Sequence, residues 1–236
     1  MRNFVFAAVL CVLVLGVCSC VDKDAQNTDT PPAKPAGDTY DAAIGDIPGG
    51  DKPETVKSID DTPLVYKGNR TALFDGKTLG GWDVLNCKAT VDNGDILIVE
   101  GNGLVQTEKK YGNFILEFDW KPLAEQKWDS GIYFRYDSVP EGQPWPKKYQ
   151  INLKQNYEGN CDEIRKAKSK GLFKPGTWNR FKLTVNGKDA SVEINGQPAW
   201  NSTGVGEPAK GYIAIQAEVP QGGKHRFRNI YITELD

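Results

Sequence analysis

Alternation of apolar and polar side chains with a period of two is the feature that most constrains how this 236-residue chain folds. In residues 113–120, NFILEFDW, the large apolar side chains fall on one face and the acidic ones on the other. Residues 180–185 repeat the pattern. This is the period of a half-buried β-strand rather than of a helix with about 3.6 residues per turn. The sequence therefore predicts an all-β fold.

Turn signals separate the predicted strands. Each of the pairs Asn93-Gly94, Asn186-Gly187 and Asn195-Gly196 suits a two-residue hairpin, because both residues tolerate positive φ. Only residues 162–170 are a candidate helix. Further segments with strand composition are 95–99, 104–107, 131–136, 191–194, 211–216 and 227–233. Short strands joined by hairpins, with almost no helix, predict a sandwich of two antiparallel sheets.

The N-terminus has the composition of a secretory signal. Residues 1–20 place one arginine before an apolar run that is short for a membrane span, followed by small residues. The ending is similar to a bacterial lipobox, in which Cys20 is lipidated and becomes the mature N-terminus. We therefore expect a lipid-anchored protein of the bacterial cell envelope, in the periplasm or at the outer membrane. An ordinary secretory signal and a retained membrane helix are the alternatives.

Composition divides the rest of the chain into a linker and one domain. Residues 21–65 are rich in Pro and Asp and nearly lack large apolar side chains, which predicts a disordered linker. Residues 66–236 have the length of a single domain. The net charge is −2 and there is no long basic run, so we expect no nucleic-acid partner.

The domain has two cysteines and the chain has one histidine. In an oxidising compartment Cys87 and Cys161 either form a disulfide or remain two buried thiols. His225 lies between two basic residues and is predicted to point to solvent. No Cys-x-x-Cys spacing is present, so a cysteine metal site is poorly supported.

The domain resembles the bacterial 3-keto-disaccharide hydrolase family, also called DUF1080. The resemblance rests on motifs that follow one another in the same order as in that family. They are 73–82 (LFDGKTLGGW), 103–107 with 111–116 (GLVQT, YGNFIL), 129–135 (DSGIYFR), 149–151 (YQI), 174–179 (KPGTWN), 211–216 (GYIAIQ) and 227–230 (FRNI).

The resemblance implies a fold and a chemistry. The fold is a concanavalin A-like jelly-roll sandwich, and the substrate is a carbohydrate oxidised at C3. A carbonyl at C3 acidifies the C2 proton, so a base can remove it, the C1 glycosidic oxygen can leave, and water can add. Such an enzyme needs a base, a cation or donor facing the enolate oxygen, and an acid for the leaving group. A divalent metal could serve as the electrophile, although the sequence identifies no ligand cluster.

Three residues are candidates for catalysis. Glu218 is the leading candidate for the base, and its alternative is a surface carboxylate beside Lys224 or Arg226. Arg135 is expected to hold a sugar hydroxyl or the enolate, or else to form a structural ion pair. Asp129 either contacts the substrate or a cation, or caps a turn.

Five further residues are candidates for substrate binding: Gln150, Gln216, Tyr133, Trp128 and Trp145. A glutamine can bind a hydroxyl group through both ends of its amide, and aromatic rings can stack on sugars, although core packing explains each ring equally well. By contrast, Asp75, Trp82, Arg228 and Asn229, in the opening and closing motifs, are expected to be structural.

The chain departs from the family pattern at one motif. Lys148 replaces the family's glutamate before Gln150, and Asn152 and Leu153 stand where an aspartate is expected. Glu158, Asp162 and Glu163 are nearby substitutes. The sequence thus leaves open an enzyme that cleaves 3-keto-glycosides, a non-catalytic carbohydrate-binding module, and, more weakly, a scaffold in a surface complex.

Overall fold

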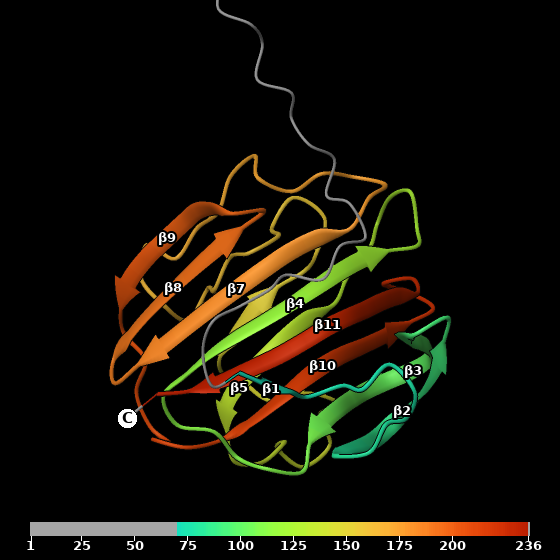
Figure 1. Ribbon diagram of the computed structural model, residues 1–236, viewed down its shortest axis with the longest axis horizontal. Helices are drawn as coiled ribbons and strands as arrows, with labels where there is room; N and C mark the ends of the chain where they lie inside the picture. Colours follow the sequence, from blue (N-terminus) through green and yellow to red (C-terminus); the bar gives the residue numbers. More distant parts are fainter. Residues whose placement is uncertain (1–69, 236) are drawn as a thin grey trace, which may run out of the picture. The chain divides into compact units, whose positions relative to one another are not determined.

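The computed structural model describes residues 70–235, which contain eleven β-strands and no helix (Figure 1). All the strand pairs are antiparallel. The strands are β1 (Thr71–Ala72), β2 (Trp82–Asp92), β3 (Asp95–Thr107), β4 (Phe114–Pro122), β5 (Gly131–Tyr136), β6 (Gln150–Asn152), β7 (Asn179–Asn186), β8 (Asp189–Ile194), β9 (Gln197–Thr203), β10 (Tyr212–Val219) and β11 (His225–Glu234). The predicted all-β class is confirmed.

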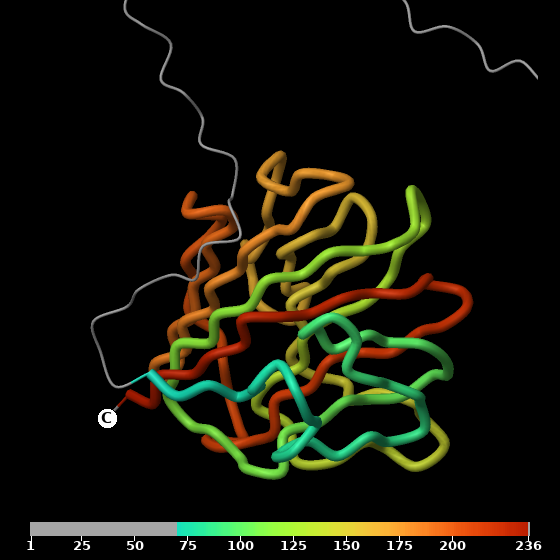
Figure 2. The backbone as a smooth tube through the Cα atoms, turned by 45° about the vertical axis from the view of Figure 1, so that its right-hand side comes forward, coloured from blue at the N-terminus to red at the C-terminus, as the bar shows by residue number. Residues whose placement is uncertain are grey.

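The strands form one hydrogen-bonded sheet that curls into two layers. Its order is β6-β5-β10-β3-β11-β4-β7-β8-β9, with β2 paired to β3 and β1 to β11. Residues 96–98 of β3 pair with β11, whereas residues 101–106 pair with β10. Gly101, with φ +93°, lies where β3 passes from one layer to the other. Figure 1 shows β5 behind β4 and β11, and Figure 2 shows β11 running beside β4.

The core lies between the two layers. Along β10 the residues Ile213, Ile215 and Ala217 are each at most 1% exposed and belong to the main apolar cluster. Phe118 of β4 and Phe181 of β7 stack in the same cluster with ring centroids 5.1 Å apart. Full burial of each isoleucine or phenylalanine side chain contributes about 1.5–3 kcal/mol to folding. This burial turns the intervening residues of β10 to the opposite, outer face.

The opening and closing motifs have the structural roles expected of them. Asp75 Oδ1 accepts hydrogen bonds from the backbone N–H groups of Lys77 (2.8 Å) and Thr78 (2.7 Å) and so closes a turn. Trp82 is buried and donates from Nε1 to the carbonyl oxygen of Leu73 at 2.6 Å. In the closing motif, Asn229 Nδ2 donates to a buried carboxylate of β4 at 2.7 Å.

Two of the three Asn-Gly hairpins form as predicted, and the third is shifted by one residue. Both residues have positive φ in Asn93-Gly94 and in Asn195-Gly196. In the hairpin between β7 and β8 the two loop residues are Gly187 and Lys188, and Gly187 has φ +58°. A glycine at the first loop position is the requirement of a type II′ turn. The candidate helix over 162–170 is not formed, and this segment is a series of turns.

The prediction that His225 points to solvent is wrong. Its side chain is 0% exposed, because β11 turns it inward together with the fully buried Phe227. Trp120 Nε1, which can only donate, lies 3.2 Å from His225 Nδ1. Nε2 therefore carries the proton and faces the carbonyl oxygens of Asp129 (3.1 Å) and Gly222 (3.0 Å).

The disulfide considered for Cys87 and Cys161 does not form, and both thiols are free. Cys87 lies on β2 and its Sγ donates to the carbonyl oxygen of Leu104 at 3.4 Å. Cys161 is 0% exposed in the main core, where burial raises the pKa of its thiol. The alternative of two separate thiols is therefore the correct one.

The predicted signal (1–20), the lipidated Cys20 and the linker (21–65) lie outside the described residues. Within residues 70–235 there is no helix of the length and apolar character that crossing a membrane requires.

Candidate functional site

A polar patch lies on the outer face of β5, β6 and β10. Tyr133 of β5 is directly opposite Gln150 of β6 on one side and Ala214 of β10 on the other, so these side chains share a face. Gln216 and Glu218 follow Ala214 at intervals of two residues and lie on the same face. The structure therefore brings together four of the predicted site residues: Tyr133, Gln150, Gln216 and Glu218.

A chain of hydrogen bonds joins the polar residues of this face. Gln150 Nε2 donates to Gln216 Oε1, and Gln216 Nε2 donates to Glu218 Oε2 at 2.9 Å. The Gln150 side chain crosses directly over Gly131, where a Cβ atom would lie 2.1 Å from Gln150 Nε2. The glycine keeps the path of this hydrogen bond open, because a Cβ atom here would displace the Gln150 amide.

Glu218 lies in a small cavity with an ion pair. Asp129 Oδ2 is 2.9 Å from Lys154 Nζ, and both residues line the cavity of about 310 Å³ that also contains Glu218. We call this the Glu218 cavity. Burial is the main cause that raises the pKa of Glu218, and the charge of Asp129 adds to it, whereas Lys154 and Gln216 act in the opposite direction. The result is a carboxylate that binds a proton more readily than an exposed glutamate.

Tyr133 adds a protonated phenol to the same face. Burial raises its pKa, and the charges of Glu163, Asp129 and Glu218 raise it further. Glu163 Oε2 also lies 3.4 Å from the backbone N of Gln150. Glu163 thus supplies a carboxylate close to Gln150, two residues after Lys148, which stands in place of the family's glutamate.

Apolar side chains border the polar patch. Tyr133 packs with Leu104, Tyr136 and Ala214 in a second apolar cluster, separate from the main core. Trp145 packs against this cluster and donates from Nε1 to the carbonyl oxygen of Ala217 at 3.2 Å. Trp145 therefore lies at the border of the patch, at the place where a ring could contact a sugar.

Arg135 and Trp128 do not lie on this face. Arg135 has φ +53° and is 4% exposed, and its guanidinium donates to the carbonyl oxygen of Gly112 (2.9 Å) and to Asn113 Oδ1 (3.0 Å). It lines a different cavity, beside Glu207. Trp128 is packed in the main core and also lines the Glu218 cavity.

Sequence reasoning missed Lys154 and named Glu163 only as one of three substitutes. Both residues lie in turns after β6, where no periodicity predicts the direction of a side chain. Within residues 70–235 no group of three or more His, Cys, Asp or Glu side chains is arranged to hold a metal ion. Two lysines, Lys127 and Lys154, line the Glu218 cavity, and Lys154 is the one that pairs with Asp129.

The curled, two-layered antiparallel sheet defines the molecule as a jelly-roll β-sandwich protein, and the family match indicates a carbohydrate-active role. The chain belongs to the family described as the 3-keto-alpha-glucoside-1,2-lyase-like domain, whose profile matches residues 69–233.

Solved structures agree with this fold. A candidate glycosyl hydrolase from Parabacteroides distasonis is 20% identical and has a TM-score of 0.56, covering 71% of this chain and 94% of its own. A protein with a galectin-like fold from Bacillus subtilis is 14% identical (TM-score 0.52; 70% and 94% covered). The carbohydrate-binding module CBM66, also from Bacillus subtilis, is 13% identical (TM-score 0.50; 65% and 96% covered). No curated protein matches the chain.

Proposed function

We propose that this protein cleaves 3-keto-glycosides at the Glu218 cavity by elimination followed by hydration. The observation that carries the proposal is the grouping of Glu218, Asp129 and Lys154 around one cavity on the outer face of β10. Membership of the family supports a C3-oxidised sugar as the substrate class. The reaction has three steps, and these side chains account for the proton and the charge in each.

Glu218 is the proposed base. Its carboxylate takes the C2 proton, and the electron pair of the C2–H bond forms an enolate with the negative charge on the C3 oxygen. The raised pKa of Glu218 favours this transfer, since a base with a pKa closer to neutrality is stronger than an exposed carboxylate.

Lys154 and Tyr133 are proposed to stabilise the developing charge. The Lys154 ammonium group is held by Asp129, so its position does not change when negative charge forms nearby. The raised pKa of Tyr133 keeps its hydroxyl protonated and able to donate a hydrogen bond. Gln150 and Gln216 keep Glu218 oriented through their hydrogen-bond chain.

Elimination and hydration then complete the reaction. The enolate re-forms the C3 carbonyl, a C1–C2 double bond forms, and the C1–O bond to the leaving group breaks. Protonated Glu218 gives its proton to the departing oxygen. Water then adds its oxygen to C1 and a proton to C2, so the products are a free 3-keto-sugar and the leaving alcohol.

The test measures turnover of a 3-keto-glucoside by the purified chain, with release of the leaving alcohol as the readout. We expect Glu218→Gln to lower kcat by at least about 100-fold, the usual size for loss of a general base. The carboxamide keeps the hydrogen bond to Gln216, so the melting temperature should stay close to that of the wild type. Wild-type turnover by Glu218→Gln would remove Glu218 as the base.

A non-catalytic carbohydrate-binding module is the second candidate, and the similarity in fold to CBM66 favours it. The two candidates differ in a simple way. A binding module would bind the 3-keto-glycoside without consuming it, both as wild type and as Glu218→Gln. Absence of turnover over several 3-keto-glycosides, with and without Mn²⁺ or Ca²⁺, would favour this second candidate.

The site of action is proposed to be the bacterial cell envelope, with the chain anchored by acyl groups on Cys20. The support is the sequence of residues 1–20. Mass spectrometry of the mature N-terminus should detect acylated Cys20, and an unmodified N-terminus at another residue would exclude the anchor.

A further inference from the structure

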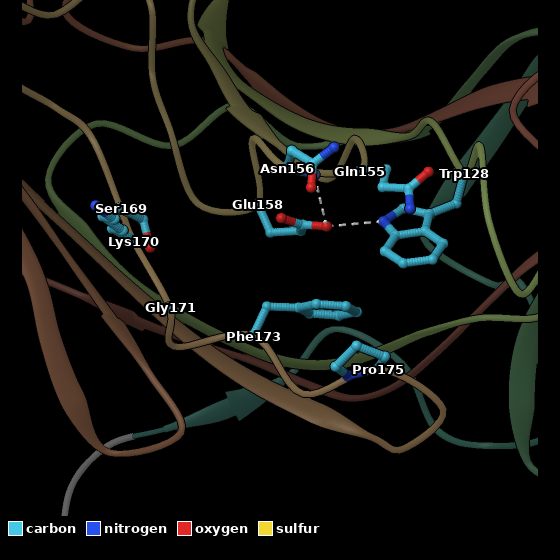
Figure 3. A pocket seen from close by; sticks show the side chains of 9 residues that line it. All are labelled: Trp128, Gln155, Asn156, Glu158, Ser169, Lys170, Gly171, Phe173 and Pro175. Carbon is cyan, nitrogen blue, oxygen red and sulfur yellow. Dashed lines mark hydrogen bonds between the residues drawn. The ribbon is translucent and has the colours of Figure 1, made fainter.

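A second cavity adjoins the Glu218 cavity on the other side of Trp128. Its volume is about 450 Å³, which lies in the range of about 300–1,000 Å³ found for small-molecule sites. We call it the Glu158 cavity (Figure 3). Trp128, Gln155 and Asn156 line both cavities, so the two are neighbours. A ligand longer than one sugar ring could reach both only by passing over these shared residues.

The Glu158 carboxylate is held in place with one oxygen available to a ligand. Trp128 Nε1 donates to Glu158 Oε1 at 3.0 Å, and the backbone N of Asn156 donates to the same oxygen at 3.1 Å. Both of these hydrogen bonds are to Oε1, and neither is to Oε2. Figure 3 shows the carboxylate between the Trp128 ring and the residues Ser169 and Lys170. A carboxylate oxygen in this position can accept hydrogen bonds from ligand hydroxyl groups.

The opposite wall is an aromatic ring fixed by the core. The centroid of the Phe173 ring lies 5.4 Å from that of Trp128 and 5.3 Å from that of Trp120. The Phe173 side chain is thus anchored on one side while it lines the cavity on the other. A rigid apolar ring facing a carboxylate matches a pyranose, which has an apolar C–H face and a rim of hydroxyl groups.

The charges of the cavity favour a neutral ligand. Glu158 and Lys170 are the only ionisable side chains among the described residues that line it, and their formal charges cancel. The remaining polar groups are the amides of Gln155 and Asn156 and the hydroxyl of Ser169. Each of them can donate a hydrogen bond to a ligand hydroxyl group or accept one from it.

The loop that carries Glu158 is already ordered by backbone hydrogen bonds. Gln155 N donates to the carbonyl oxygen of Trp128 at 3.0 Å, and Gly159 N donates to that of Asn152 at 2.7 Å. Trp200 Nε1 donates to the carbonyl oxygen of Gly159 at 2.7 Å. Binding in this cavity therefore does not require the loop to fold first, which lowers the entropic cost of binding.

We propose that the Glu158 cavity is a second carbohydrate site that binds a neutral pyranose. Where the proposed function holds, this pyranose is the leaving-group sugar of a substrate whose oxidised sugar lies in the Glu218 cavity. Glu158 accepts hydrogen bonds from its hydroxyl groups, Phe173 packs on its C–H face, and Lys170 donates from the opposite side.

The first experiment does not depend on turnover. The indole N–H resonance of Trp128, which reports on Glu158, is followed by NMR during titration with glucose, with glucuronate and glucosamine as charged comparisons. We expect a saturable shift with glucose that is weaker with both charged sugars. Glu158→Gln and Lys170→Ala should each weaken glucose binding by about 10-fold, the size of one hydrogen bond to a charged group. Lys174→Ala, just outside the cavity, is the matched control and should bind like the wild type.

The second experiment compares two substrates, a 3-keto-disaccharide and a methyl 3-keto-glucoside, which lacks the second sugar. Glu158→Gln and Lys170→Ala should each lower kcat/KM for the disaccharide, relative to kcat/KM for the methyl glucoside, by about 10-fold. The loss should come mainly from a higher KM for the disaccharide. Absence of a saturable glucose shift, or equal losses on both substrates, would overturn the proposal. A glucose shift in a protein that turns over no 3-keto-glycoside would support this site and reject the proposed function.

Discussion

Acid should destabilise this protein through one residue, the buried His225. Burial lowers the pKa of His225 from 6.5 to about 4, with the carbonyl oxygens of Gly222 and Asp129 acting in the opposite direction. A depressed folded-state pKa means that the unfolded chain binds a proton at a pH where the folded chain does not. Stability is therefore fully present above about pH 6.5 and is lost as the pH falls toward about 4.

The magnitude follows from the two pKa values. Each pH unit between them costs about 1.4 kcal/mol, so the contribution lost is about 2 kcal/mol at pH 5 and about 3 kcal/mol at pH 4. A domain of ordinary stability has about 5–15 kcal/mol in total, so this loss is readily measurable. His225 is the only histidine of the chain, so no other imidazole contributes.

Urea unfolding at several pH values, on the wild type and on His225→Gln, separates this effect from the titration of carboxylates. Glutamine carries no charge at any pH, and every carboxylate is common to both proteins. We expect the wild type to lose about 3 kcal/mol relative to the variant between pH 7 and pH 4. A difference in unfolding free energy that stays constant within about 0.5 kcal/mol over this range would refute the reasoning.

Two further predictions concern charges on opposite sides of the sandwich. Because Lys154 lowers the pKa of Glu218, Lys154→Ala should move the acidic limb of the pH profile of kcat/KM to higher pH, whereas Lys154→Arg should leave the limb near its wild-type position. An unmoved limb in the alanine variant would mean that Glu218 does not govern it. Asp119, with a side chain 2% exposed, accepts from Arg180 Nε at 2.8 Å, so Asp119→Asn should cost about 3–5 kcal/mol in urea unfolding. The exposed Asp137→Asn is its control, and equal effects of both would contradict the role of burial.

Much of the fold follows from the period of two. The alternation along β10 places Gln216 and Glu218 on one face, as expected from their spacing in the sequence. The same rule predicts that His225 points inward, because it lies two residues before the buried Phe227 on β11. The basic residues on either side of His225 instead led to the prediction that it points to solvent. Here the periodicity was the better guide than the local charge.

Several of the positions that sequence reasoning misjudged lie where the backbone leaves the regular strand geometry. Arg135 adopts positive φ, so its side chain does not follow the alternation of β5. Strand β2 was missed because most of its residues are exposed and give no apolar pattern. Lys154 and Glu163 lie in turns, whose side-chain directions depend on tertiary contacts that one sequence does not reveal.

The acidity of Glu218 depends on Gly131 in the neighbouring strand β5, because a glycine has no Cβ atom. A single methyl group at position 131 would displace the Gln150 amide and leave Gln216 free to turn away from the carboxylate. Position 131 is thus a place where the proton affinity of the site could be retuned, by mutation or by natural variation, without replacing any group that meets the sugar.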